Sequence, residues 1–142
     1  MSEQNCVFCK ICRGESPETK IYYQDEELTV FMDHKPATTH HYLVCTKQHI
    51  PDPKVLRKSD MGLVERMMNV GMQVLQENDG DTGDVRMGFH WPPFNAICHL
   101  HLHVISPQRQ MTLISKAIFM LNSLWFVSVK WLMDHLSAME DE

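Results

Sequence analysis

Residues 99–105 read His99-Leu100-His101-Leu102-His103-Val104-Ile105, an alternation of histidine and apolar residues. Successive side chains of a β-strand point to opposite faces, so in a strand the three imidazoles share one face and the apolar side chains share the other. On a helix, residues two apart diverge by roughly 200°, and the alternation would serve neither face. We therefore expect a strand over 97–105 that packs its apolar face on the core and presents a row of imidazoles on the other.

The rest of the chain predicts a sheet around one long helix. Runs of β-branched and aromatic residues favour strands over 21–24, 27–32, 41–46 and 85–89. Helix is expected over 59–77, where apolar residues at steps of three and four form a core-facing stripe: Val64, Met67, Met68, Gly71, Val74 and Leu75. From residue 111 onward we expect helix, broken near 122–123 and resumed over 130–139. Strands without regular βαβ alternation indicate an α+β fold with an antiparallel sheet.

The composition suits one folded domain over residues 1–142, since 44% of the 142 residues are hydrophobic and 22% are charged. The net charge is −5, so binding of nucleic acid through a broad basic surface is not expected. The apolar tract from Ala117 to Val129 is shorter than the roughly 20 residues that span a bilayer, and no membrane association is expected. The polar start from Met1 to Asn5 does not resemble a secretion signal, and we expect the five cysteines to stay reduced.

Three imidazoles on one face suit two kinds of chemistry. A neutral imidazole is a nucleophile near pH 7, and neighbouring imidazoles can orient it and supply protons during phosphoryl transfer. Alternatively, strand histidines at i and i+2 can share one zinc ion, as in hydrolytic sites with three histidines. A cluster without any role is the third interpretation, although packing alone gives little reason to gather three imidazoles. The alternation by itself leaves these alternatives open.

Several motifs resemble segments of the histidine triad superfamily, and they occur in the family's order. The run over 99–105 is similar to the family signature, and C-V-F-C-K-I at 6–11, F-M-D-H-K-P-A at 31–37, H-H-Y-L-V at 40–44 and K-Q-H-I at 47–50 resemble its upstream segments. The resemblance covers about 6–105, which we expect to be the core of the domain, with 106–142 as a branch-specific tail. It implies a five-stranded antiparallel sheet with one long helix and a C-terminal helical tail. It also implies a dimer that shares a ten-stranded sheet.

Residues 86–94 and 122–126 further resemble a branch of the family that hydrolyses nucleoside phosphoramidates. The resemblance implies cleavage of the P–N bond in adenosine 5′-monophosphoramidates, with acyl-adenylates as a second substrate class, through a nucleotidyl-histidine intermediate. It implies a cytoplasmic and nuclear protein that forms a homodimer or a larger homo-oligomer. Three alternatives remain open: a dinucleoside polyphosphate hydrolase, a deadenylating enzyme of the same superfamily, and an AMP-sensing interaction protein with little catalysis.

The resemblance also assigns roles to individual residues. His101 matches the nucleophile that attacks the α-phosphorus, and His99 and His103 match flanking histidines that orient it and bind phosphate oxygens. His49 matches an upstream histidine that contacts the triad. Asp33 matches the acid that binds the ribose hydroxyls, for which a carboxylate is a suitable double acceptor. The catalytic set is thus His49, His99, His101 and His103, and the substrate-binding set is Asp33, His34, His90, His101, Leu102 and His103.

Other positions depart from the family pattern or leave a choice open. Ala96 stands where many relatives carry a serine that protonates or holds the leaving group, and His90 stands where relatives often carry an asparagine beside the ribose. Trp125 and Trp131 either border a nucleotide pocket across a dimer interface or belong to an aromatic core, and we expect Trp131 to be core. No cofactor is expected to be required. The alternative is a zinc ion held by Cys6, Cys9, His49 and His99.

Overall fold

The computed structural model describes residues 5–140, which form one antiparallel sheet with helices around it. Residues 1–4, the start of the polar segment that argued against a secretion signal, and residues 141–142 of the expected tail lie outside this range. The sheet has six strands: β1 (Ile21–Gln24), β2 (Leu28–Met32), β3 (His40–Thr46), β4 (Arg86–His90), β5 (His101–Ser106) and β6 (Phe126–Ser128). Their order is β1-β2-β3-β5-β4-β6, and every neighbouring pair is antiparallel. The predicted α+β class is confirmed.

The expected number of five strands is wrong, because a sixth strand lies in a segment that the sequence predicts as broken helix. β6 has three residues, too few for an alternation to stand out, and it forms by pairing with the edge of β4. A sheet shared with a partner would therefore have to continue from β1 or from the short strand β6. The expected dimer stays a prediction.

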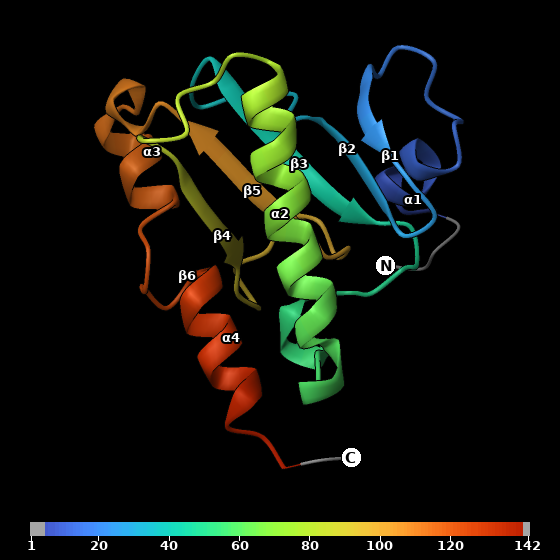
Figure 1. Cartoon of the computed structure of the whole chain (residues 1–142), viewed down its shortest axis with the longest axis vertical. Coiled ribbons are helices and arrows are strands. Elements are labelled where there is room, and N and C mark those ends of the chain that lie inside the picture. Colours follow the sequence, from blue (N-terminus) through green and yellow to red (C-terminus); the bar gives the residue numbers. More distant parts are fainter. Residues whose placement is uncertain (1–4, 141–142) are drawn as a thin grey trace.

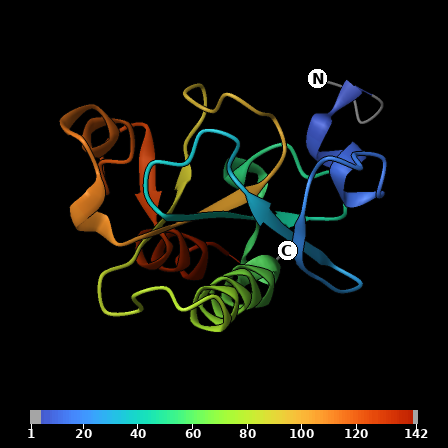
Figure 2. The same ribbon diagram turned by 90° about the horizontal axis from the view of Figure 1, so that it is seen from above.

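Within residues 5–140, four α-helices accompany the sheet: α1 (Val7–Cys12), α2 (Met61–Glu77), α3 (Leu113–Ile118) and α4 (Val129–Ser137). Short 3-10 turns lie at Pro53–Val55, Lys58–Asp60 and Gln108–Gln110. Figure 1 shows α2 and α4 in front of the sheet, and the view from above in Figure 2 places α1 and α3 near its opposite ends. The sequence analysis predicts no helix or strand over 7–12. The helix α1 in this segment is capped at its start by Cys6, whose Sγ accepts the backbone N–H of Cys9.

The main core lies between α2, α4 and one face of the sheet. The buried residues of α2 are Val64, Met67, Val70, Gly71, Val74 and Leu75, so the predicted core-facing stripe is confirmed except at Met68, which is half-buried. Gly71 lets the helix approach the sheet closely, because a Cβ at this position would stand 2.8 Å from a methyl group of Val104 on β5.

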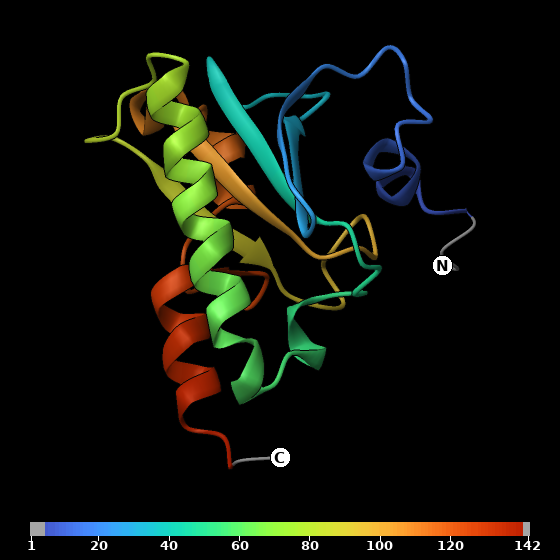
Figure 3. The ribbon, with the colours of Figure 1, turned by 45° about the vertical axis from the view of Figure 1, so that its right-hand side comes forward.

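The residues that follow β5 contribute to the same core. Leu132 and Leu136 of α4 are fully buried in one cluster with Val127 of β6 and the inner face of α2. Figure 3 shows α4 lying alongside α2 on the same side of the sheet. Between residues 5 and 140, no helix is both long enough and apolar enough to cross a membrane.

Candidate active site

The histidines gather on the face of the sheet that α2 does not cover. His101 and His103 lie on β5 opposite β3, while Leu102 and Val104 point into the core under α2. The predicted alternation is therefore confirmed from residue 101 onward. The predicted strand is wrong at its start, because β5 begins at His101 and the N–H of Leu100 donates to the carbonyl of Ile50 instead of to a strand partner. Only two of the three imidazoles belong to the strand.

The main chain sets the protonation of His101. Its Nδ1 lies 2.6 Å from the carbonyl oxygen of His99, and a carbonyl only accepts, so Nδ1 carries the proton and Nε2 the lone pair. The ring of Phe8 from α1 packs edge-on against this imidazole, with 5.0 Å between centroids. Burial lowers the pKa of His101 to about 4. The side chain is thus a neutral imidazole at pH 7, the form required for nucleophilic attack.

His41 is a member of the site that the sequence analysis missed. Its Nε2 lies 2.9 Å from Nδ1 of His103, and its own Nδ1 accepts the backbone N–H of Ala37 at 3.0 Å. An Oδ2 of Asp33 lies 3.5 Å from the same Nε2. Burial lowers the pKa of both His41 and His103. The sequence contains a signal for this position: in a strand, the side chain of His41 points to the face opposite the apolar side chains of Tyr42 and Val44. Using that signal requires knowing that β3 pairs with β5.

A second cluster surrounds His99. Its Nδ1 lies 3.2 Å from Sγ of Cys6 and 3.4 Å from Sγ of Cys9. Nδ1 of His49 lies 3.1 Å from the Cys9 sulfur, and the rings of His49 and His99 are 5.1 Å apart. His49 therefore meets the triad at its first histidine, as expected, and does so beside two cysteines. The four ligand atoms all lie within 4.8 Å of one another.

These four side chains fit a zinc ion. Two sulfur and two imidazole ligands are a common tetrahedral zinc set. The Nε2–H of His99 donates to the carbonyl oxygen of Thr46 at 2.6 Å, which leaves the lone pair of Nδ1 facing the two sulfurs. A hydrogen bond of this kind on the far nitrogen is typical of metal-binding histidines. Bound here, zinc would tie α1 to the segment that enters β5.

The remaining residues that the sequence analysis assigns to substrate binding differ in their position and in their exposure to solvent. The Asp33 side chain is 16% exposed at the end of β2, and its Oδ1 accepts the N–H of Lys35 at 2.9 Å. His34 is 87% exposed and lies 3.6 Å from the Asp33 carboxylate. Leu102 is fully buried on the core face, so only its main chain borders the imidazoles. His90 lies at the end of β4, next to His103.

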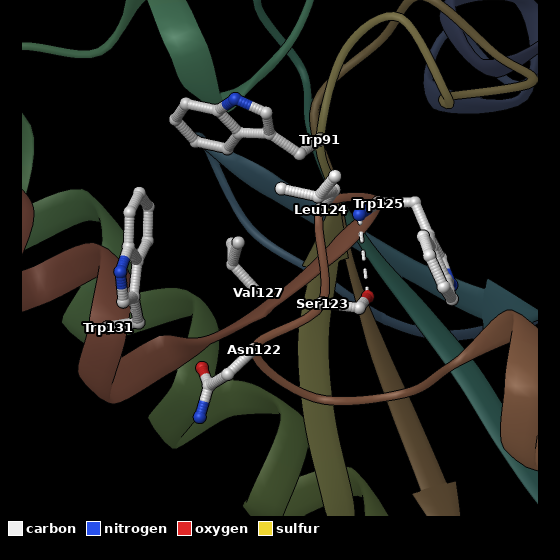
Figure 4. A pocket seen from close by; sticks show the side chains of 7 residues that line it. All are labelled: Trp91, Asn122, Ser123, Leu124, Trp125, Val127 and Trp131. Carbon is white, nitrogen blue, oxygen red and sulfur yellow. Dashed lines mark hydrogen bonds between the residues drawn. The ribbon is translucent and has the colours of Figure 1, made fainter.

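Of two pockets in the structure, one is lined by histidines of the triad and the other is not. A cavity of about 10 Å³ is lined by His90 and His101 together with the loop residues Asn95 and Ile97. A pocket of about 550 Å³ is shown in Figure 4 and is lined by Trp91, Asn122, Ser123, Leu124, Trp125, Val127 and Trp131. The larger pocket contains no histidine of the triad, so we locate the chemistry at the small cavity, which accommodates a phosphoryl oxygen or one water molecule.

The tail tryptophans lie at the larger pocket, and one prediction about them is wrong. Trp131 is 38% exposed and does not belong to the buried core, because it stacks on His135 of the same helix at 4.9 Å and meets Trp91 edge-on at 5.2 Å. Trp125 is half-buried, and its indole N–H donates to the carbonyl of Ala117 at 2.8 Å.

An antiparallel sheet with this row of imidazoles defines a histidine triad protein, and the chain belongs to the histidine triad (HIT) superfamily. A family model described as "Scavenger mRNA decapping enzyme C-term binding" matches residues 5–118. The chain is 44% identical to the adenosine 5′-monophosphoramidase HINT3 of Mus musculus, with 94% of this chain and 82% of the relative covered. It is 42% identical to the protein of the same name from Xenopus tropicalis, with 96% and 90% covered. A HIT family hydrolase from Legionella pneumophila superposes with a TM-score of 0.69 at 28% identity, covering 77% of this chain and 97% of that one.

Proposed function

We propose that the chain hydrolyses the P–N bond of adenosine 5′-monophosphoramidates through adenylylation of His101. The observation that carries this proposal is the 2.6 Å contact between Nδ1 of His101 and the carbonyl of His99, which leaves the Nε2 lone pair available at the small cavity. The names of the relatives from Mus musculus and Xenopus tropicalis support the substrate class. The same site would accept acyl-adenylates, because the attacked phosphorus is the same.

The reaction follows from the protonation states of the site. The Nε2 lone pair of His101 forms a bond to the α-phosphorus, and the leaving nitrogen takes the electron pair of the broken P–N bond and a proton from the solvent. Ala96, between the cavity-lining residues Asn95 and Ile97, is exposed and has no hydroxyl to supply that proton. Water then attacks the adenylylated imidazole, releasing AMP and restoring the neutral ring. The Nδ1–H bond to His99 stabilises the positive charge that His101 carries while the phosphoryl group is attached.

Other residues have binding or structural roles in the proposed reaction and form no bond to the phosphorus. Asp33 offers a partly exposed carboxylate as an acceptor for the ribose hydroxyls. Zinc bound by Cys6, Cys9, His49 and His99 would have a structural role, because these side chains fill all four coordination positions and leave no position for a substrate.

We also propose a cytoplasmic and nuclear location. None of the five cysteines forms a disulfide within the described residues, and reduced cysteines are typical of these compartments.

Mass spectrometry of the trapped intermediate tests the reaction. Protein mixed with an adenosine phosphoramidate and quenched in base should carry one adenylyl group on the peptide that contains residue 101, since phosphohistidine-type bonds survive alkali. His101→Ala should abolish both the adduct and turnover while AMP binding persists. Residual turnover above a few per cent of the wild-type rate in that variant would show that another group is the nucleophile.

A panel of substrates ranks the alternatives. The chain is 46% identical over 70% of its length to an Arabidopsis thaliana protein named bifunctional adenosine 5′-phosphosulfate phosphorylase/adenylylsulfatase. Adenosine phosphoramidate should be cleaved faster than adenosine 5′-phosphosulfate, diadenosine polyphosphates and adenylated DNA. Binding of AMP without measurable turnover of any of the four would instead favour an AMP-sensing role.

A further inference from the structure

Two cysteines at the start of α1 hold their sulfur atoms close together. Cys6 caps the helix, Cys9 follows three residues later, and their Sγ atoms lie within 4.8 Å of each other. The carbonyl of Cys6 accepts the N–H of Lys10 at 3.1 Å, so the main chain makes a helical turn between the two cysteines. Residues three apart in a helix have Cα atoms about 5 Å apart, inside the range of roughly 4.4–6.8 Å that a disulfide spans. Rotation of the two side chains is therefore enough to form a disulfide.

The other three cysteines are less well placed. Cys12 is also three residues from Cys9, but its Sγ faces the carbonyl oxygen of Thr46 at 3.8 Å and is not among the four clustered ligand atoms. Cys45 is fully buried in β3, and burial raises the pKa of its thiol, which makes it unreactive. Cys98 lies in the loop between β4 and β5. The pair at the start of α1 is thus the one built to be oxidised.

A small oxidant can reach this pair. Cys6 and Cys9 are 0% and 2% exposed, but Asn5 and Val7 on either side of Cys6 are exposed. His49, whose Nδ1 lies 3.1 Å from the Cys9 sulfur, is only half-buried. A helix of six residues has little stability of its own, so local opening of α1 admits a molecule as small as hydrogen peroxide.

The two thiols support the residues that hold His101. The lone pair of Nδ1 of His99 faces both sulfurs, so their S–H groups donate to it, whereas a disulfide has no proton to donate. Loss of these donors from a buried ring is costly, which favours a shift of His99. The carbonyl of His99 accepts the Nδ1–H of His101 at 2.6 Å. Phe8, which lies between the two cysteines in the chain, packs its ring 5.0 Å from that of His101. A change at the sulfurs therefore reaches His101 by two routes.

We propose that Cys6 and Cys9 form an oxidative modification site, at which a peroxide produces a disulfide that slows the reaction at His101 and a thiol reductant restores it. Two S–H bonds break and one S–S bond forms. The two electrons and two protons released reduce one hydrogen peroxide to two water molecules. The disulfide also uses both sulfur ligands, so it excludes zinc from the cluster. The slowing of the reaction rests on the proposed function, whereas formation of the disulfide does not.

Peptide mapping identifies the disulfide. Protein treated with hydrogen peroxide is denatured, alkylated and cut with trypsin, which cleaves after Lys10 and Arg13. A disulfide between Cys6 and Cys9 lies within one peptide, which should escape alkylation and be lighter by two hydrogen atoms. A disulfide between Cys9 and Cys12 would instead join two peptides. The Cys12→Ser variant is the matched control on the same helix and should still form the expected disulfide, whereas Cys9→Ser should not.

Turnover reports the consequence. Oxidation should slow the cleavage of an adenosine phosphoramidate at pH 7 by up to about 10²-fold, as for a catalytic group that is slightly misplaced. Dithiothreitol should restore the rate, and the rate of Cys9→Ser should not respond to peroxide. Should Cys9→Ser not fold, restoration by dithiothreitol is the control, because this reagent does not reduce oxidised methionine.

Labelling of His101 keeps this test separate from the proposed function. Diethyl pyrocarbonate acylates accessible neutral imidazoles, so the labelling rate of residue 101 should rise several-fold in the disulfide form. If the reduced protein releases no AMP, the proposed function fails and the labelling rate decides. Absence of the disulfide between Cys6 and Cys9 would overturn the proposal. So would a disulfide that leaves the turnover of an active protein, or the labelling of an inactive one, unchanged.

Discussion

Acidification tests whether His101, the proposed nucleophile, is as well shielded from water as the structure shows. Burial lowers the pKa of His101 to about 4, and only the neutral ring can attack phosphorus. At pH 5 about nine tenths of such a side chain is neutral, against about 3% for a histidine with the ordinary pKa of about 6.5. The rate of adenylylation at pH 5 should therefore be about 30-fold higher than an ordinary histidine would allow.

The assay is the single-turnover rate of AMP release from an adenosine phosphoramidate between pH 4.5 and 8, corrected for spontaneous hydrolysis. The folded-state pKa lies below the unfolded value, so between pH 6.5 and 4 the unfolded chain binds more protons and the free energy of unfolding falls as the pH falls. Circular dichroism at each pH therefore accompanies the rates. A fall in rate with a midpoint near 6.5, in protein that is still folded, would refute the reasoning about burial.

Three further outcomes are expected. Gly88→Ala should lower the free energy of unfolding by about 1–3 kcal/mol in urea titrations, because a Cβ there meets the ring of Phe126 and the carbonyl of Val127. Gly62→Ala is the control and should be neutral or stabilising, because beyond its chain neighbours and its own helix backbone a Cβ there meets no atom within 4 Å. Leu136→Ala should cost about 2–5 kcal/mol, and an effect as small as that of the exposed Lys130→Ala would show that α4 is not part of the core. Protein purified without chelator should contain about one zinc per chain by elemental analysis and Cys9→Ser should lose it, whereas a wild-type content below about a tenth of an equivalent would exclude the site.

The strengths and failures of the sequence prediction have separate physical causes. The alternation from His101 to Ile105 and the stripe on α2 are local patterns, and both are confirmed in the structure. The place of His99 outside the strand depends on a hydrogen bond between Leu100 and Ile50, which no local pattern reveals. The contact of His41 with His103 likewise depends on which strands pair. β6 is too short for a periodic signal, and its existence follows from the free edge of β4.

Two aromatic rings that pack against His90 and His103 come from a part of the chain that the family model does not match. That model ends at residue 118, and Phe119 and Phe126 lie just beyond it, against His90 and His103. A protein with the same reacting atoms and a C-terminal segment without these two rings would therefore leave these imidazoles more exposed to water. Evolution could in this way retune the acidity at which a histidine triad works by exchanging its tail, leaving the chemistry on the sheet untouched.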